Sequence, residues 1–282
     1  MSNKECTDLR TMYLGLLKKS VLNTLYLEDE LRIHYLKKCI ENNDSYTYKA
    51  LHDIKNFWPE EWEKLKESRN IGRFIDRDIK NSGFNHSMIG VKRMESLHNC
   101  LDYVNNNNIP GDLVECGVWR GGGTIFMAGY VKAHEDSSRD IYVVDSFEGL
   151  PKPSLPQDRS LDLSKEKFPQ LAVDEEEVKN NFAKYDLLDD HIHFVKGWFK
   201  DSLPKCDMEQ IALLRMDGDL YESTMDILDN LYDKVVESGV IIVDDYAIKP
   251  CRLAVEDFFK KRNLPFPNYQ EIDWTGIWWT KK

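Results

Sequence analysis

Two stretches decide the fold of this chain: Leu214-Arg215-Met216-Asp217-Gly218-Asp219-Leu220-Tyr221-Glu222-Ser223-Thr224 and Val240-Ile241-Ile242-Val243-Asp244-Asp245-Tyr246. Each contains an apolar run typical of a buried strand, and each run ends in paired aspartates. In an open α/β sheet, ligands bind outside the carboxyl ends of the strands. The two stretches therefore predict a metal centre with oxygen ligands at that edge of a sheet.

Strand and helix patterns alternate from about residue 110 onward. The sequence predicts strands at 112–116, 141–145, 192–196, 211–216 and 240–244, and helices near 122–133, 175–186, 223–236 and 251–262. This alternation is typical of a parallel sheet, so we expect a doubly wound α/β fold. Residues 269–274 and 276–280 are expected to add a closing pair of strands, and 146–174 form the longest irregular connection.

Residues 7 to about 80 have a helical pattern. The first helix is expected to end at the acidic cluster Glu28-Asp29-Glu30, a second to run from Leu31 to Ile40, and a third to start at Trp58-Pro59. We expect residues 1–85 to form a helical extension that acts as a lid or an oligomerisation region. Residues 86–282 would then form the cofactor-binding catalytic domain.

Composition narrows the possible partners. The 282 residues carry a formal net charge of -11 and no basic patch, which opposes binding to nucleic acid. No stretch approaches the ~20 apolar residues that span a bilayer, and the first residues lead into no apolar signal core. The six cysteines lie apart without a C-x-x-C motif, which fits reduced thiols. We expect a cytoplasmic protein that binds no membrane and forms a homo-oligomer, a dimer.

A glycine-rich turn follows the first predicted strand, at Leu113 to Thr124. Gly117 permits a tight turn, Gly121 and Gly122 allow close backbone approach, and the helix that starts there offers N–H groups to an anion. Asp145 ends the next strand, 22 residues after Gly123, close to the spacing at which an acidic residue meets ribose hydroxyls. The turn and Asp145 together predict an adenosine-containing cofactor.

The motif disfavours two common cofactors. G-x-G-x-x-G is absent and so is G-x-x-x-x-G-K-[ST], so NAD and ATP both lose support. The carboxylate of S-adenosylmethionine can occupy the helix start in place of phosphates, and Glu115 could hold its ammonium group. Alternatively, Glu115 is a strand carboxylate satisfied by N–H groups of the loop.

The aspartates invite both functional and structural interpretations. Asp217 and Asp219 would face one side of an extended backbone, because side-chain direction repeats every two residues. Asp219 to Glu222 also match a capping box at a helix start, and the two roles can coexist. Asp244 and Asp245 repel each other unless a cation or hydrogen-bond donors compensate. Oxygen ligands without histidine or thiolate favour Mg²⁺ over Mn²⁺ or Ca²⁺, and a solvated acidic loop end remains the alternative.

Three further features carry weaker signals. His191 and His193 share one strand face without a third ligand, which favours a plain strand edge. Trp198 either lies against an adenine or is a core residue. The segment containing Met88 joins the extension to the catalytic domain, where it would cover the cofactor or serve as a linker.

Together these motifs resemble the macrocin O-methyltransferase family of S-adenosylmethionine-dependent sugar O-methyltransferases. The matching segments include Val144-Asp145-Ser146-Phe147-Glu148-Gly149-Leu150-Pro151 and also 13–20, 87–90, 113–124, 194–199, 214–224, 243–246 and 272–276. They cover most of residues 8–280, whereas residues 41–80 depart from the family pattern and are interpreted as an insertion.

The resemblance implies a class I methyltransferase (Rossmann-like) fold, Mg²⁺ held by Asp217, Asp244 and Asp245, and Asp219 or Asp217 as the catalytic base. The expected acceptor is a hydroxylated small molecule, a sugar or other vicinal diol of a natural product. The candidate cofactor-binding residues are Met88, Glu115, Gly117, Gly121, Gly122, Thr124, Asp145, Ser146, Trp198 and Asp217. A NAD-linked oxidoreductase and a non-catalytic binding module are the competing hypotheses.

Overall fold

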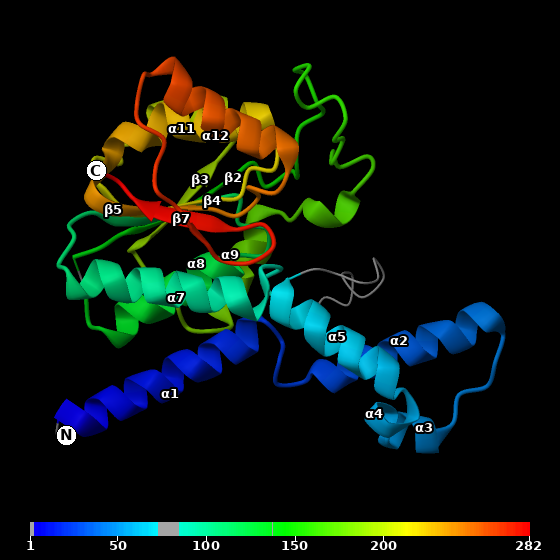
Figure 1. Cartoon of the computed structure of the whole chain (residues 1–282). Helices are drawn as coiled ribbons and strands as arrows, with labels where there is room; N and C mark the ends of the chain where they lie inside the picture. Colours follow the sequence, from blue (N-terminus) through cyan, green and yellow to red (C-terminus); the bar gives the residue numbers. More distant parts are fainter. Residues whose placement is uncertain (1–2, 73–84, 137) are drawn as a thin grey trace.

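A parallel sheet extended by an antiparallel hairpin forms the centre of the molecule (Figure 1). The structure is a computed structural model that describes residues 3–72, 85–136 and 138–282. Within these ranges seven strands run in the order β3-β2-β1-β4-β5-β7-β6. They are β1 Asp112–Cys116, β2 Ile141–Asp145, β3 Ile192–Lys196, β4 Ile211–Met216, β5 Val235–Val243, β6 Gln270–Glu271 and β7 Ile277–Thr280. The doubly wound sheet and its closing pair of strands are therefore confirmed.

Helices cover both faces of this sheet. The described helices are α1 Asn3–Val21, α2 Leu27–Asn42, α3 Tyr48–His52, α4 Ile54–Phe57, α5 Pro59–Ile71, α7 Gly90–Asn106, α8 Gly122–Ala133, α9 Glu175–Ala183, α10 Phe199–Ser202, α11 Tyr221–Leu231 and α12 Lys249–Lys261. Short 3-10 helices occur at η1 Pro169–Leu171, η2 Leu203–Lys205 and η3 Tyr232–Lys234.

Alternation along the strands divides the core into two layers. Leu113 and Leu213 point into the layer that contains α1, α7, α8 and α9, and their neighbours Val114 and Leu214 point into the layer that contains α11 and α12. Figure 1 shows α7 and α8 on one side of the sheet and α11 and α12 on the other. The near-continuous apolar runs of β1 and β4 follow from this burial on both faces.

One helix boundary differs from the prediction. The helix expected at 223–236 ends at Leu231, the chain tightens into η3, and Val235 already starts β5 by pairing with Ile211. Val235 is buried, and a β-branched residue packs well on the pleated surface of a sheet. The apolar residues near 235 are therefore part of strand β5 and not of the predicted helix.

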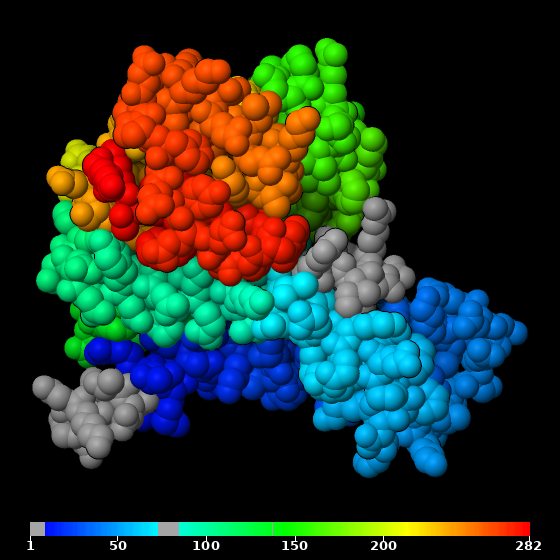
Figure 2. All heavy atoms as spheres, viewed as in Figure 1, coloured from blue at the N-terminus to red at the C-terminus, as the bar shows by residue number. Residues whose placement is uncertain are grey.

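The N-terminal region does not divide at residue 85. Leu14, Leu17 and Val21 of α1 are buried in the same core as the sheet, so α1 packs as part of the sheet domain. Helices α2 to α5 instead share a small core of their own, which includes Leu31 and Ile54. Figure 2 shows these helices, blue to cyan, projecting beside the sheet domain. We call residues 27–71 the helical appendage.

The acidic cluster does not end the first helix. The chain leaves α1 after Val21, turns at Asn23 with φ of 52°, and begins α2 at Leu27, so the cluster lies in the first turn of α2. Negative charge is favourable there, because the helix dipole is positive at its start. Glu30 is buried and pairs with Arg69 at 2.7 Å. The predicted helical region extended to about residue 80, and its last part, 73–80, lies outside the described residues.

The described cysteines form no disulfide bonds. The cysteines at 39, 100, 116, 206 and 251 are free, and Cys116 is a core residue of β1, as predicted. No helix in the described part of the chain is long and apolar enough to cross a membrane.

Candidate active site

Three carboxylates meet where β4 and β5 end. The two strands are parallel neighbours with Met216 opposite Val243, so Asp217 and Asp244 follow side by side. The N–H of Asp244 donates to the carbonyl of Met216 at 2.9 Å, which keeps the strand ends together. One carboxylate oxygen from each of Asp217, Asp244 and Asp245 lies within 4.8 Å of the others. The structure thus brings together the three residues that the sequence proposed as metal ligands.

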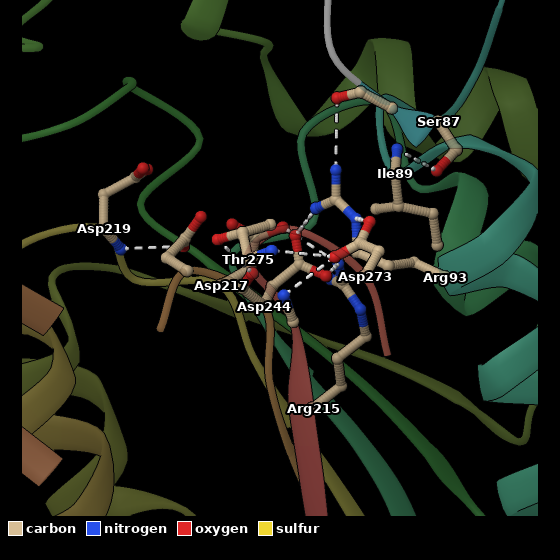
Figure 3. Close-up of polar contacts among 12 residues, drawn as sticks. Ser87, Ile89, Arg93, Arg215, Asp217, Asp219, Asp244, Asp273 and Thr275 are labelled. Carbon is tan, nitrogen blue, oxygen red and sulfur yellow. Dashed lines mark hydrogen bonds and ion pairs between the residues drawn. The ribbon is translucent and has the colours of Figure 1, made fainter. Parts of the chain in front are cut away.

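Two buried arginines enter this cluster, and sequence reasoning missed both (Figure 3). Arg215 lies 2.6 Å from Glu115, 3.1 Å from Asp217 and 2.5 Å from Asp244. Arg93, on α7, contacts the other oxygen of Asp244. Arg215 did carry a signal, since a charge inside the apolar run of β4 needs buried partners. Arg93 carried none, because one basic residue on a mixed helix does not stand out.

The charge balance of the cluster is negative. Burial raises the pKa of Asp245 well above its usual value, and neighbouring carboxylates, Asp219 foremost, raise it further. Burial also raises the pKa of Asp217, and the charge of Asp244 adds to the effect. Burial acts in the same direction on Asp244, but the two arginines outweigh it and lower the pKa of that carboxyl. Two guanidinium groups leave negative charge uncompensated, so a proton or a further cation is favoured at Asp217 and Asp245.

The residues fit a divalent cation. Oδ1 of Asp244 is buried and receives no hydrogen bond, although Nη2 of Arg215 lies 2.5 Å away in an ion pair that is not aligned for one. Three carboxylate oxygens without nitrogen or sulfur ligands suit Mg²⁺. A carboxylate oxygen has two lone pairs, so Oδ1 can face a metal cation as well as Arg215.

Asp219 departs from both sequence interpretations. Its φ of 53° is left-handed and not extended, so the argument from strand alternation was wrong. Its backbone N–H donates to Asp245 at 3.1 Å. Asp219 is also no helix cap: α11 begins at Tyr221, and Asp158 accepts the N–H groups of Tyr221 and Glu222 at 2.6 and 3.1 Å. The capping residue thus comes from the 146–174 connection, which local sequence could not reveal.

A cavity of about 930 Å³, open to solvent, lies at these strand ends. Six candidate residues line it, namely Met88, Gly117, Asp145, Ser146, Trp198 and Asp217. The wall also includes Asp219 and residues that were not among the candidate site residues: Trp119, Gly149, Leu150, Pro151, Leu171, Gly197, Phe199, Lys200, Gly218, Glu222, Ser223 and Asp226. Part of the 146–174 connection is therefore a wall of the cavity.

Gly117 is required by close approach of two strand ends. Its φ is 87°, and a Cβ atom there would lie 1.9 Å from the carbonyl oxygen of Asp217. The tight turn predicted at Gly117 is confirmed. Asp145 closes the same edge, since its carboxylate accepts the N–H groups of Val118 and Phe147, both at 2.8 Å. Burial raises the pKa of Asp145.

In the rest of the glycine-rich turn, the groups expected to bind a ligand contact other groups of the protein. The N–H of Gly122 donates to the carbonyl of His86 at 2.8 Å, and Oγ1 of Thr124 donates to the carbonyl of Gly121 at 3.0 Å. Glu115 is buried and pairs with Arg215, not with N–H groups of the loop. None of these four candidates, Glu115, Gly121, Gly122 and Thr124, lines the cavity. In this structure the first N–H of the helix is not open to an anion.

His193 lies on the edge strand β3, and His191 immediately precedes that strand. His191 and His193 contact Asp140 at 2.9 and 3.2 Å, and all three side chains are well exposed. Within the described ranges, Asp217, Asp244 and Asp245 form the one group of three or more ligand-type residues close enough to share a metal ion.

The chain is similar to known O-methyltransferases over most of its length. The profile of the family described as Macrocin-O-methyltransferase (TylF) matches residues 10–281. Demethyldecarbamoylnovobiocin O-methyltransferase of Streptomyces niveus is 40% identical over 282 residues, which is 99% of this chain and 96% of that protein. The 8-demethyl-8-(2,3-dimethoxy-alpha-L-rhamnosyl)-tetracenomycin-C 4'-O-methyltransferase of Streptomyces olivaceus is 38% identical over 275 residues, 96% of this chain and 93% of that protein. The structure of the O-methyltransferase NovP superimposes with a TM-score of 0.78 at 38% identity, and the match covers 97% of this chain and 99% of that one.

Proposed function

The chain belongs to the macrocin O-methyltransferase family, and we propose that it methylates a sugar hydroxyl of a natural product with the help of Mg²⁺. As a member of this family it is an O-methyltransferase that uses S-adenosylmethionine. The NAD-linked oxidoreductase and the non-catalytic module considered from the sequence are therefore set aside. One relative is named for a rhamnosyl tetracenomycin acceptor, which supports a sugar hydroxyl here.

The meeting of Asp217, Asp244 and Asp245 beside the cavity is the observation that carries the metal-dependent part of the proposal. A bound divalent cation would act as a Lewis acid that lowers the pKa of an acceptor hydroxyl and orients two neighbouring acceptor oxygens. Of the three proposed ligands, Asp217 also lines the cavity, so it lies nearest to the substrates.

Asp219 is the residue that we propose as the base. It lines the cavity but is not one of the three clustered carboxylates. In Figure 3 the Asp219 side chain lies apart from Asp244 and its arginines. Its carboxylate would take the proton of the acceptor hydroxyl as that oxygen forms a bond to the methyl carbon. The carbon–sulfur bond breaks at the same time, and its electron pair leaves with neutral S-adenosylhomocysteine.

We propose that the cofactor occupies the part of the cavity between Asp145 and Trp198. Both residues line the wall, where Asp145 would face ribose hydroxyls and Trp198 would lie against adenine. Gly117 and Met88 complete that wall. Glu115, Gly121, Gly122 and Thr124 would then act from behind it, by shaping the turn that bears Gly117.

The test is methyl transfer by the purified full chain from S-adenosylmethionine to matched acceptors, with Mg²⁺ or with a chelator. A glycoside with a free vicinal diol should gain one methyl group only when Mg²⁺ is present, and the same glycoside with one diol oxygen blocked should react far more slowly. Equal rates with chelator would refute the metal role. Reaction with a catechol but with no glycoside would refute the sugar acceptor.

Several expectations stay predictions. They are the homodimer, the cytoplasmic location, the insertion at 41–80 and the role of residues 1–85 as a lid or an oligomerisation region. Sedimentation of the purified chain, compared with a chain that lacks the appendage, would test the oligomeric role directly.

A further inference from the structure

The turn between β6 and β7 reaches the carboxylate cluster. Oγ1 of Thr275 donates to the carbonyl oxygen of Asp244 at 3.1 Å. Oδ1 of Asp273 accepts the N–H groups of Thr275 and Gly276 at 3.0 and 2.9 Å, which fixes the turn. The side chain of Asp273 is 1% exposed, so it acts inside the protein. This hairpin, at the far end of the sequence, is therefore built against the end of β5.

Arg93 connects this turn to Asp244 (Figure 3). Its Nε lies 3.1 Å from Oδ2 of Asp273, its Nη2 donates to the carbonyl of Gly72 at 3.2 Å, and its Nη1 donates to Oδ2 of Asp244. The side chain is 7% exposed. The guanidinium is thus held from two sides, by the hairpin and by the end of α5, before it contacts Asp244.

The same end of α5 is tied to the hairpin by a second bond. Nε1 of Trp274 donates to the carbonyl of Ile71 at 2.9 Å. Gly72 and Gly90 cross so closely that a Cβ atom on Gly90 would lie 2.2 Å from the Gly72 nitrogen. The backbone that presents the Gly72 carbonyl to Arg93 therefore has little freedom to shift.

The consequence falls on the second oxygen of Asp244. A carboxylate is planar, so a hydrogen bond that fixes Oδ2 also fixes the direction of Oδ1. That oxygen is buried and lies 2.5 Å from Nη2 of Arg215 without an aligned hydrogen bond, so it keeps a lone pair for a further cation. Carboxylates that bind metals are commonly oriented by hydrogen bonds from outside the ligand set.

We propose that Arg93, held by Asp273, is a positioning residue that aims Oδ1 of Asp244 at the divalent cation. The proposal rests on the cation site proposed above and adds to it a residue that touches neither cation nor substrate. Arg93 needs the fork of the guanidinium for this role, because one nitrogen faces Asp273 while another binds Asp244.

A purely electrostatic role for Arg93 makes different predictions. A positive charge beside a cation site repels the cation, so charge alone would make Arg93 weaken metal binding. Arg93→Lys keeps the charge but loses the fork. Positioning therefore predicts weaker metal binding in Arg93→Lys, whereas charge alone predicts no change.

The experiment is titration of the full chain with Mn²⁺, read from the paramagnetic resonance signal of free Mn²⁺. Arg93→Lys and Asp273→Asn should each weaken Mn²⁺ binding about ten- to a hundredfold. The double variant should lose less than the product of the two, because both act through one contact. Arg262→Lys, which changes an exposed pair with Asp233 on the far side of the sheet from α7, should bind as wild type.

The outcomes separate the two proposals. Wild-type Mn²⁺ affinity in Arg93→Lys, or losses that simply multiply in the double variant, would overturn the positioning role. Failure of the wild-type chain to bind Mn²⁺, or undiminished binding in Asp245→Asn, would overturn the cation site itself. A thermal melt accompanies each variant; should Arg93→Lys not fold, Arg93→Gln decides, because loss of the charge alone would strengthen Mn²⁺ binding whereas loss of positioning would weaken it.

Discussion

The strand ends of β4 and β5 and the glycine-rich turn after β1 were both predicted to bind ligands, yet they differ in the folded protein. At the strand ends the predicted carboxylates converge to within 4.8 Å. At the turn, Gly117 lines the cavity but Gly121 and Gly122 do not, and the carbonyl of His86 takes the first N–H of α8.

The difference lies in the range of the interactions involved. Asp217 and Asp244 must meet, because they follow directly from paired residues of adjacent parallel strands. Whether a helix start is open depends on what else packs there. Residues 85–88 fill the start of α8, and nothing in the local pattern of 113–124 announces them. The position of a side chain that is fixed by sheet register is thus easier to predict from sequence than whether a helix start is open to a ligand.

The largest effect should come from the strand ends. Asp245→Asn removes a proposed metal ligand that does not line the cavity, so turnover with Mg²⁺ should fall roughly a hundredfold or more, while S-adenosylmethionine still binds. Steady-state kinetics and calorimetric titration measure the two quantities. Asp233→Asn, at an exposed site, is the control. A comparable loss of cofactor binding in Asp245→Asn would show that the two regions are not separable.

Gly122→Ala tests the occupied turn. The added methyl group would lie 2.4 Å from the His86 carbonyl oxygen, so the segment bearing Met88 must move. Unfolding free energy should drop by ~1–3 kcal/mol, as for other overpacked sites, and cofactor affinity should fall with it. Chemical denaturation gives the first quantity. Gly15→Ala is the matched control, because its methyl group would meet nothing within 4 Å. Unchanged stability in Gly122→Ala would mean that the helix start is open after all.

Asp158→Ala addresses the cap that was wrongly assigned to Asp219. Asp158 is fully buried and holds two N–H groups of α11, so its loss should cost about 1–2 kcal/mol of unfolding free energy. Because the 146–174 connection lines the cavity, KM for the acceptor should rise while cofactor binding stays the same. Asp174→Ala removes the cap of α9 and should lower stability without changing KM. An unaltered acceptor KM in Asp158→Ala would show that the 146–174 connection does not contribute to the acceptor site.

The smallest effect concerns pH. Burial foremost, then the charges of Lys184 and Arg120, lower the pKa of His86 from 6.5 to about 4. The unfolded chain therefore binds a proton near pH 6.5 that the folded chain refuses until about pH 4, so stability is full above pH 6.5 and falls as pH drops toward 4. The ring is partly accessible to solvent, so we expect roughly 1 kcal/mol from this residue. His86→Gln should flatten that part of the profile of unfolding free energy against pH; an identical slope in both proteins would contradict the shift.

Several errors of sequence reasoning have the same origin. Glu115 was predicted to bind either a ligand or N–H groups of the loop. Its partner is instead Arg215, which lies 100 positions later in the sequence. The cap of α11 lies 63 residues before Tyr221. Arg93 and Asp273 lie far apart in the sequence, yet their side chains are 3.1 Å apart in the structure. In each case a buried charge found a distant partner, because an unpaired one would be costly.

The sequence by itself determined the parallel sheet, the family, and the aspartates that meet at the strand ends. The spacing of hydrophobic residues is a local property, and the pairing of neighbouring strands is set by their register. Both can therefore be inferred from the sequence. Only the tertiary structure decided which helix starts are filled, which arginines enter the carboxylate cluster, and that α1 belongs to the core of the sheet domain while α2 to α5 do not. All of these features depend on packing between segments that are distant in the sequence. Buried groups there are matched by shape and charge, and such matching produces no periodic pattern in the sequence.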